Sequence, residues 1–262
     1  MIVFGMELRR GRKGLFIWSM SIAFMLVICV LMFPEMRDQM DSVSEMFANM
    51  GGFTQAFGMD RLNFGSLIGF YGVECGNILG IGGGFFAAYL GITMLAKEES
   101  EHTAEFLLTH PVSRLSIVFQ KLLAVVTQIL VMNLLVFLFS VASILFIGES
   151  LPMRELLLLH GAYFILQLEI GLICFGISAF LRRGSIGVGL GLAAIFYFMN
   201  ILCNISSNTE FLQYITPFAY AEPADIVEHT SLDTKLILLG CLYAIVAVLL
   251  GLIRYRQKDI AA

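Results

Sequence analysis

The chain has 262 residues, of which 58% are hydrophobic and 14% are charged, and its formal net charge is −4. An average soluble domain is about 25% charged, and a soluble globule of this length has too little interior for so many apolar side chains. No basic run is long enough to follow a phosphate backbone. The composition therefore excludes a soluble enzyme, a nucleic-acid-binding protein and a disordered chain, and it predicts a membrane protein.

A membrane-spanning helix needs about 20 mostly apolar residues. Six runs meet this requirement with at most one charged residue each, at about 14–34, 75–96, 115–148, 156–181, 184–205 and 236–253. The runs are continuous, whereas the strands of a membrane barrel alternate apolar and polar residues. The sequence therefore predicts an all-α polytopic protein, with residues 1–262 forming one transmembrane domain of six helices.

Basic residues are enriched in the cytoplasmic loops of membrane proteins. Twelve Lys and Arg residues flank one side of the predicted spans: Arg9, Arg10, Arg12, Lys13, Lys97, Arg114, Lys121, Arg182, Arg183, Arg254, Arg256 and Lys258. The opposite side has Arg37, Arg61, Arg154 and Lys235. We therefore expect both termini and the loop 97–114 in the cytoplasm, and the loop 206–235 outside.

Residues 1–13 combine apolar side chains with the first four of these basic residues. Such a segment suits an interface helix at the inner leaflet, where anionic lipid attracts basic side chains. It also suits a plain basic flank of the first span, and both interpretations stay open. Membrane lipid is a predicted contact in either case.

Glycines recur every four residues near the start of the second span, at Gly72, Gly76, Gly80 and Gly84. Small residues at this spacing let helix backbones approach closely in lipid. We interpret the stripe as helix packing, either within one chain or between two copies.

The loop after the second span reads KEESEHTAEFLLTHPVSRLSIVFQK, from Lys97 to Lys121. Its acidic start suits the N-terminus of a short helix, and Pro111 suits the first turn of a second one. The apolar residues from Ala104 to Leu108 cannot all face water. They favour either a groove on a partner protein or a helix lying on lipid.

Glu169 lies near the middle of the fourth span. A carboxylate inside a membrane costs several kcal/mol unless it is paired or hydrated, so it is a candidate functional residue. It either faces a translocation path, together with Asn133 and Asn200, or bonds to a neighbouring helix through Gln128, Asn133 or Asn200. Both interpretations remain open.

The outer loop 206–235 is apolar between Phe211 and Val227 and contains Pro217 and Pro223. Irregular backbone at membrane depth is tolerated where protein covers it. This segment is therefore predicted to be re-entrant or interfacial.

The inner loop resembles the signature of ABC-2 type transporter permeases. The matching residues are Glu98, Glu99, Thr103, Glu105, Leu107, Leu108, Pro111, Val112, Ser113, Arg114 and Lys121. A glycine commonly precedes the threonine in that family, and here the residue is His102. The order of the six spans, the basic N-terminus and the stretch TPFAYAEPADIV (Thr216–Val227) are also similar to the family.

The resemblance implies that Glu98 to His110 is a coupling helix that docks on a separate ATPase subunit. The residues expected to take part are Glu98, Glu99, Glu101, Thr103, Glu105, Phe106, Leu107, Leu108, Pro111 and Arg114. It also implies a second permease subunit, identical or different, and export across a bacterial cytoplasmic membrane. ATP and Mg²⁺ would bind to the partner ATPase.

The sequence has no phosphate-binding GxxxxGK[ST], no HExxH and no GxSxG motif. We therefore expect no catalytic residue, bound cofactor or metal site on this chain. Two alternatives to an ATP-driven permease remain. One is an ATP-independent channel or secondary transporter, and the other is a polytopic membrane enzyme using Glu74, Glu169 and His160.

Overall fold

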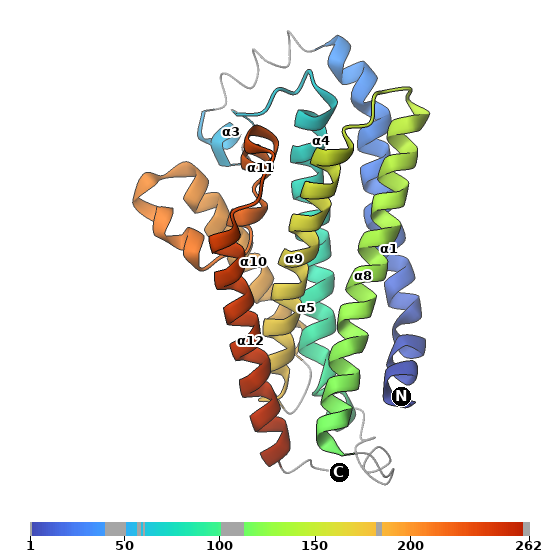
Figure 1. The fold of residues 1–262 in the computed structure, drawn as a ribbon, viewed down its shortest axis with the longest axis vertical. Helices are drawn as coiled ribbons and strands as arrows, with labels where there is room; N and C mark the ends of the chain where they lie inside the picture. The colour runs from blue at the N-terminus through green and yellow to red at the C-terminus, as the bar shows by residue number, and fades with distance from the viewer. Residues whose placement is uncertain are drawn as a thin grey trace.

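The computed structural model describes residues 2–39, 51–56, 59, 61–100, 113–181 and 185–258, apart from the side chains of residues 53, 98 and 100. Every regular element within these residues is a helix, and six helices are long and apolar enough to cross a membrane. The predicted all-α class and the six spans are confirmed. The spans stand side by side, and the start of the first lies at the same end as the finish of the last (Figure 1).

The spanning helices are α1 (Ile2–Asp38), the continuous run α4 (Leu67–Cys75), η1 (Gly76–Ile81) and α5 (Gly82–Met94), then α8 (Arg114–Phe146), α9 (Met153–Ser178), α10 (Ile186–Ile205) and α12 (Thr234–Gln257). The shorter helices are α3 (Gly52–Ala56), α6 (Lys97–Ser100), η2 (Ser207–Tyr214), η3 (Ala219–Ala221) and α11 (Pro223–His229).

Residues 2–13, for which an interface helix and a basic flank of the first span both stayed open, form one helix with that span, α1. It runs unbroken for 37 residues, and this length of about 55 Å exceeds the hydrocarbon core of about 30 Å. The Gln120 side-chain oxygen accepts hydrogen bonds from the Val3 and Phe4 amides, at 3.1 and 3.3 Å. These amides lack helical partners at an N-terminus, so contact with α8 favours a continued helix over a turn onto the lipid.

The second span begins at Leu67, earlier than the predicted start near residue 75. The predicted start followed from Glu74, the charged residue just before the uncharged run. In the structure Glu74 lies within α4 and does not interrupt the helix. The Ser66 hydroxyl accepts a bond from the Gly69 amide at 3.2 Å and caps the helix. Downstream, six residues form the π-helix η1, a wider turn that is often found at functional sites.

Helix α9 lies between α5 and α12, whereas α1 packs along α8. The buried core side chains of α9 include Tyr163, Leu166, Ile170 and Phe175. Helices α10 and α12 have few buried residues and expose large apolar side chains such as Phe198 and Leu238. These two helices therefore have largely apolar outer surfaces.

The segment between α10 and α12 folds back onto the bundle. Helix η2 projects to one side, in orange in Figure 1. The Thr216 hydroxyl then donates to the Phe196 carbonyl of α10 at 2.7 Å. The following Phe218, Tyr220 and Ile226 side chains are buried. The bundle thus covers the later part of the apolar stretch, whereas Phe211 and Ile215 at its start are exposed.

Candidate coupling, pathway and outer-pocket sites

A buried ion-pair cluster lies at the end of the bundle where the chain begins. The Glu7 carboxylate of α1 lies 3.3 Å from the Lys121 ammonium and 3.4 Å from that of Lys97. Glu7 and Lys121 are almost completely buried, and Lys121 also donates to the Met94 carbonyl at 2.7 Å. The cluster therefore joins α1, the end of α5 and the start of α8.

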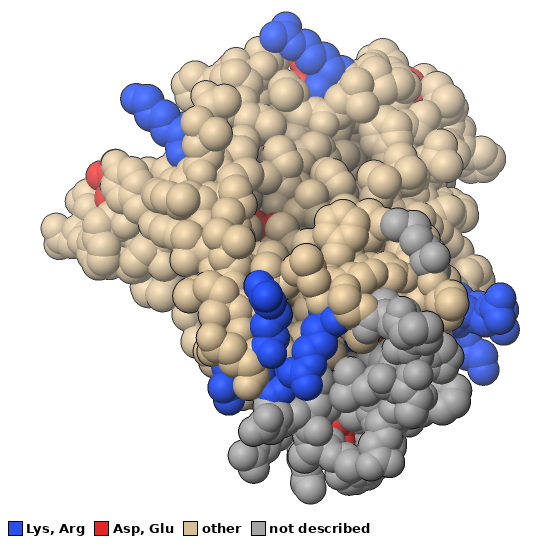
Figure 2. Space-filling model, turned by 60° about the horizontal axis from the view of Figure 1, so that its bottom comes forward, with Lys and Arg blue, Asp and Glu red and all other residues tan. Residues whose placement is uncertain are grey.

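A second set of contacts holds the end of α12 at the same place. The Arg114 guanidinium donates to the carbonyls of Tyr255, Arg256 and Lys258, and the last distance is 2.7 Å. The Lys258 ammonium lies 2.9 Å from the Glu99 carboxylate and donates to the Leu181 carbonyl at 2.6 Å. Several Lys and Arg side chains lie on this end of the molecule (Figure 2).

The predicted coupling residues fall into two groups. Glu98 lies in α6, Glu99 pairs with Lys258, and Arg114 begins α8. The others lie outside the described residues: Glu101, Thr103, Glu105, Phe106, Leu107, Leu108 and Pro111. The described part shows that both ends of this segment are tied to the bundle, through Glu7 at one end and through the α12 terminus at the other.

Glu169 is buried between α9, η3 and α12. Its carboxylate accepts a hydrogen bond from the Tyr220 hydroxyl at 2.9 Å. A side chain at Gly240 of α12 would collide with this carboxylate, so the glycine provides its space. The three partners considered from the sequence bond elsewhere: Asn133 to Gln167, Gln128 to the Ala124 carbonyl and Asn200 to Glu222.

Asn133 belongs to a chain of amide bonds across the bundle. Its side-chain nitrogen donates to Gln167 at 2.6 Å, and the Gln167 nitrogen donates to the Leu79 carbonyl at 3.1 Å. Leu79 lies in the π-helix, and Gly83 leaves room for the Gln167 amide. Asn133, Glu169 and Asn200 thus belong to three separate groups of hydrogen bonds.

The glycine stripe of the second span faces the interior of the same chain. A Cβ at Gly76 would lie 2.9 Å from the Tyr163 hydroxyl, and a Cβ at Gly80 would lie 3.1 Å from the Tyr163 ring. A Cβ at Gly72 would lie 3.3 Å from Pro223, which is a tight contact, and a Cβ at Gly84 would lie 3.5 Å from Ile170, which is an ordinary one. The stripe therefore accommodates α9 and the outer segment within one chain.

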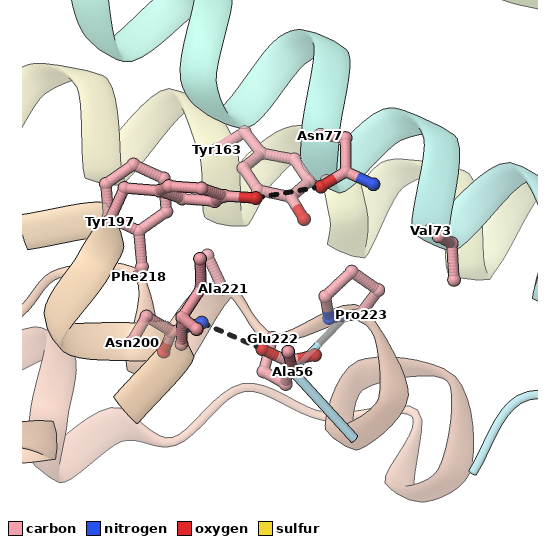
Figure 3. Close-up of a pocket in the computed structure, with 12 residues that line it drawn as sticks. Ala56, Val73, Asn77, Tyr163, Tyr197, Asn200, Phe218, Ala221, Glu222 and Pro223 are labelled. Atoms are coloured by element: carbon pink, nitrogen blue, oxygen red, sulfur yellow. Dashed lines mark hydrogen bonds between the residues drawn. The ribbon is translucent and has the colours of Figure 1, made fainter. Parts of the chain in front are cut away.

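A small polar pocket lies where these glycines meet the outer segment (Figure 3). The buried Glu222 carboxylate accepts bonds from the side-chain amides of Asn200 at 3.0 Å and Asn204 at 3.1 Å. Burial raises the pKa of Glu222 above its usual range, and these two hydrogen bonds partly offset the increase. On the opposite wall, the Tyr197 hydroxyl donates to Asn77 at 3.1 Å.

The profile of a protein family described as ABC-2 family transporter protein matches residues 1–260. The chain belongs to this ABC-2 transporter family. No curated protein sequence gives a significant match. Membership of the ABC-2 family makes this chain a multi-pass membrane component of an ABC transporter, which is not itself the catalytic subunit.

Sequence reasoning missed two buried carboxyl groups of this ABC-2 chain, those of Glu7 and Glu222. Glu7 is the only acidic residue before Glu35, and a lone acid in an apolar and basic stretch is a detectable signal for a buried partner. Glu222 offered a weaker signal, because acidic residues are common in its loop. Lys121 was expected to flank the third span, but it is fully buried in the ion-pair cluster.

Proposed function

We propose that this chain is the membrane-spanning subunit of an ATP-driven exporter, coupled through residues 97–114 to a separate ATPase. Family membership supports a permease. The observation that supports coupling through this segment is the pair of attachments at its ends, from Lys97 to Glu7 and from Arg114 to the end of α12. A force on the segment would act on α1 and α12 together.

In this proposal both termini face the cytoplasm of a bacterial cell, as the basic residues indicate. ATP and Mg²⁺ bind to the partner ATPase, whose closure and opening pull on the segment. A second permease subunit, either the same chain or a relative, completes the path. The apolar surfaces of α10 and α12 are available to lipid and to that subunit.

Replacing Phe106 by aspartate tests the coupling segment. We expect at least a fivefold loss of the ATPase that co-purifies with the tagged chain in mild detergent, because a charge disfavours an apolar groove. The measurement is quantitative mass spectrometry of the pull-down. Phe211→Asp is the matched control, since Phe211 is exposed on η2 in the outer segment.

The control variant should retain the wild-type amount of ATPase. Recovery of equal amounts of ATPase with Phe106→Asp, at equal membrane insertion, would show that the segment does not dock. If a pull-down from native membrane and crosslinking both find no Walker-motif ATPase, ATP-driven transport is wrong for this chain.

Glu169→Gln tests whether the buried carboxylate serves transport. Glutamine keeps the size and an oxygen that accepts from Tyr220, but it removes the acidic group. We therefore expect unchanged co-purification and at least a threefold change in the ATPase turnover of the reconstituted complex. Glu155→Gln, in the first turn of the same helix, is the control. Wild-type turnover with glutamine at residue 169 would restrict this residue to packing.

A further inference from the structure

The outer pocket combines a carboxylate with neutral oxygen atoms and aromatic rings. Its volume is about 30 Å³, and its walls include Glu222, Tyr163, Asn77, Tyr197 and Phe218. A space of about 10–15 Å³ holds one water-sized group, whereas sites for drug-sized ligands occupy about 300–1,000 Å³. The pocket therefore admits one or two small atoms or ions and excludes an organic cargo molecule.

One polar group of the pocket has no partner among the described residues. Tyr163 is 1% exposed, and its hydroxyl makes no hydrogen bond within the described part of the chain. Figure 3 shows this hydroxyl beside Asn77, pointing toward the space above Glu222. A buried hydroxyl without a partner is costly, so the pocket needs an occupant that Tyr163 can bind.

The charge of Glu222 narrows the choice of occupant. Its two bonding partners, Asn200 and Asn204, are neutral amides. The nearby Arg61 is engaged by Asp225 at 2.6 Å and by Glu228 at 2.7 Å. A buried carboxylate without a counter-charge is unfavourable, so Glu222 requires either a proton or a bound cation.

We propose that the outer pocket binds one small monovalent cation between the Glu222 carboxylate and the Tyr163 hydroxyl. One carboxylate balances one positive charge. Ca²⁺ sites usually place several carboxylates among their six to eight oxygen ligands, whereas the lining of this pocket offers one, and the pocket has no room for the water shell that Mg²⁺ retains.

The bound cation joins α9, which carries Tyr163, to Glu222, the N-cap residue immediately before α11. Glu222 is in turn bonded to α10 through Asn200 and Asn204. The ion thus fastens the outer segment to the bundle. This inference concerns a structural ion inside one chain and holds whether or not the chain couples to an ATPase.

The test is thermal unfolding of the purified full chain in detergent. Buried Cys75 and Cys174 report unfolding through a thiol-reactive dye. NaCl, KCl or NH4Cl replaces choline chloride at constant ionic strength and pH. We expect a saturable rise in Tm with at least one of the three cations, of about 3–6 °C at ten times Kd. The cation with the lowest Kd identifies the ion.

Glu222→Gln should abolish the saturable rise, because it removes the charge and keeps an acceptor oxygen for Asn200 and Asn204. Glu210→Gln is the control, since Glu210 is an exposed glutamate on η2 and should respond as wild type does. Tyr163→Phe keeps the ring and should raise the apparent Kd at least threefold.

Equal Tm in all four salts would overturn the proposal, as would a wild-type response from Glu222→Gln. The pocket would then hold water beside a protonated Glu222. If the glutamine variant does not fold, binding of radioactive sodium and rubidium to the wild-type chain decides. Less than one choline-resistant ion per chain with both tracers at saturation, together with no rise in the wild-type Tm in NH4Cl, would also overturn it.

Discussion

Replacing Lys121 by methionine is expected to lower the free energy of unfolding by about 3–5 kcal/mol, because it leaves the Glu7 carboxylate buried without its better-shielded partner. Lys121 is fully buried, whereas Lys97 is a quarter exposed and lies 3.4 Å from Glu7. The Met94 carbonyl loses its 2.7 Å hydrogen bond in the same substitution. The measurement is chemical or thermal unfolding of the purified chain.

Lys235→Met serves as the matched control, since Lys235 is exposed in the first turn of α12 and should change stability by less than about 0.5 kcal/mol. Adding Glu7→Gln to Lys121→Met should recover at least half of the loss, because the unpaired charge is removed with its partner. Equal stability of Lys121→Met and the control would show that the cluster is not a structural pair.

The second large loss of stability that we expect follows from adding a single methyl group at residue 176, in Gly176→Ala. A Cβ at Gly176 would collide with the Ala247 carbonyl of α12, and a Cβ at Gly251 would lie 2.8 Å from the Gly176 Cα. The two backbones touch here, so relief requires movement of a whole helix. We expect Gly176→Ala to lower the free energy of unfolding by about 1–3 kcal/mol.

Gly191→Ala on α10 is the control for this substitution. A Cβ at Gly191 has nothing within 4 Å, and alanine favours helix by about 1 kcal/mol over glycine. This variant should be as stable as wild type or more stable. If Gly176→Ala matched it, α9 and α12 would not cross at the close distance described.

Long apolar runs made the six spans predictable from sequence, because a helix in lipid must satisfy its own backbone bonds. The ends of the helices were harder to predict from the sequence. The second span was predicted to start after Glu74, but one carboxylate near a helix end does not stop a helix. The π-helix Gly76–Ile81 has the composition of any glycine-rich helix, so its wider turn left no signature in the sequence.

The hydrogen-bond and ion-pair partners of the buried charged and polar residues could not, for the most part, be predicted from the sequence. Glu169 bonds to Tyr220 and Glu7 pairs with Lys121, and each pair joins elements far apart in the chain. Residue type identified Glu169 as unusual because a buried carboxylate is costly. Its partner depends on how the outer segment folds back, and the spacing of residues does not encode that fold.

The unbroken length of α1 has a mechanical consequence. The helix is held by Glu7 near its start, and Arg37 near its end pairs with Glu149 after α8. A rod of about 55 Å that tilts by about 5° about one end displaces the other by about 5 Å. Small rotations at the charged base of the bundle therefore become movements of atomic size at the opposite rim, with no hinge required in between.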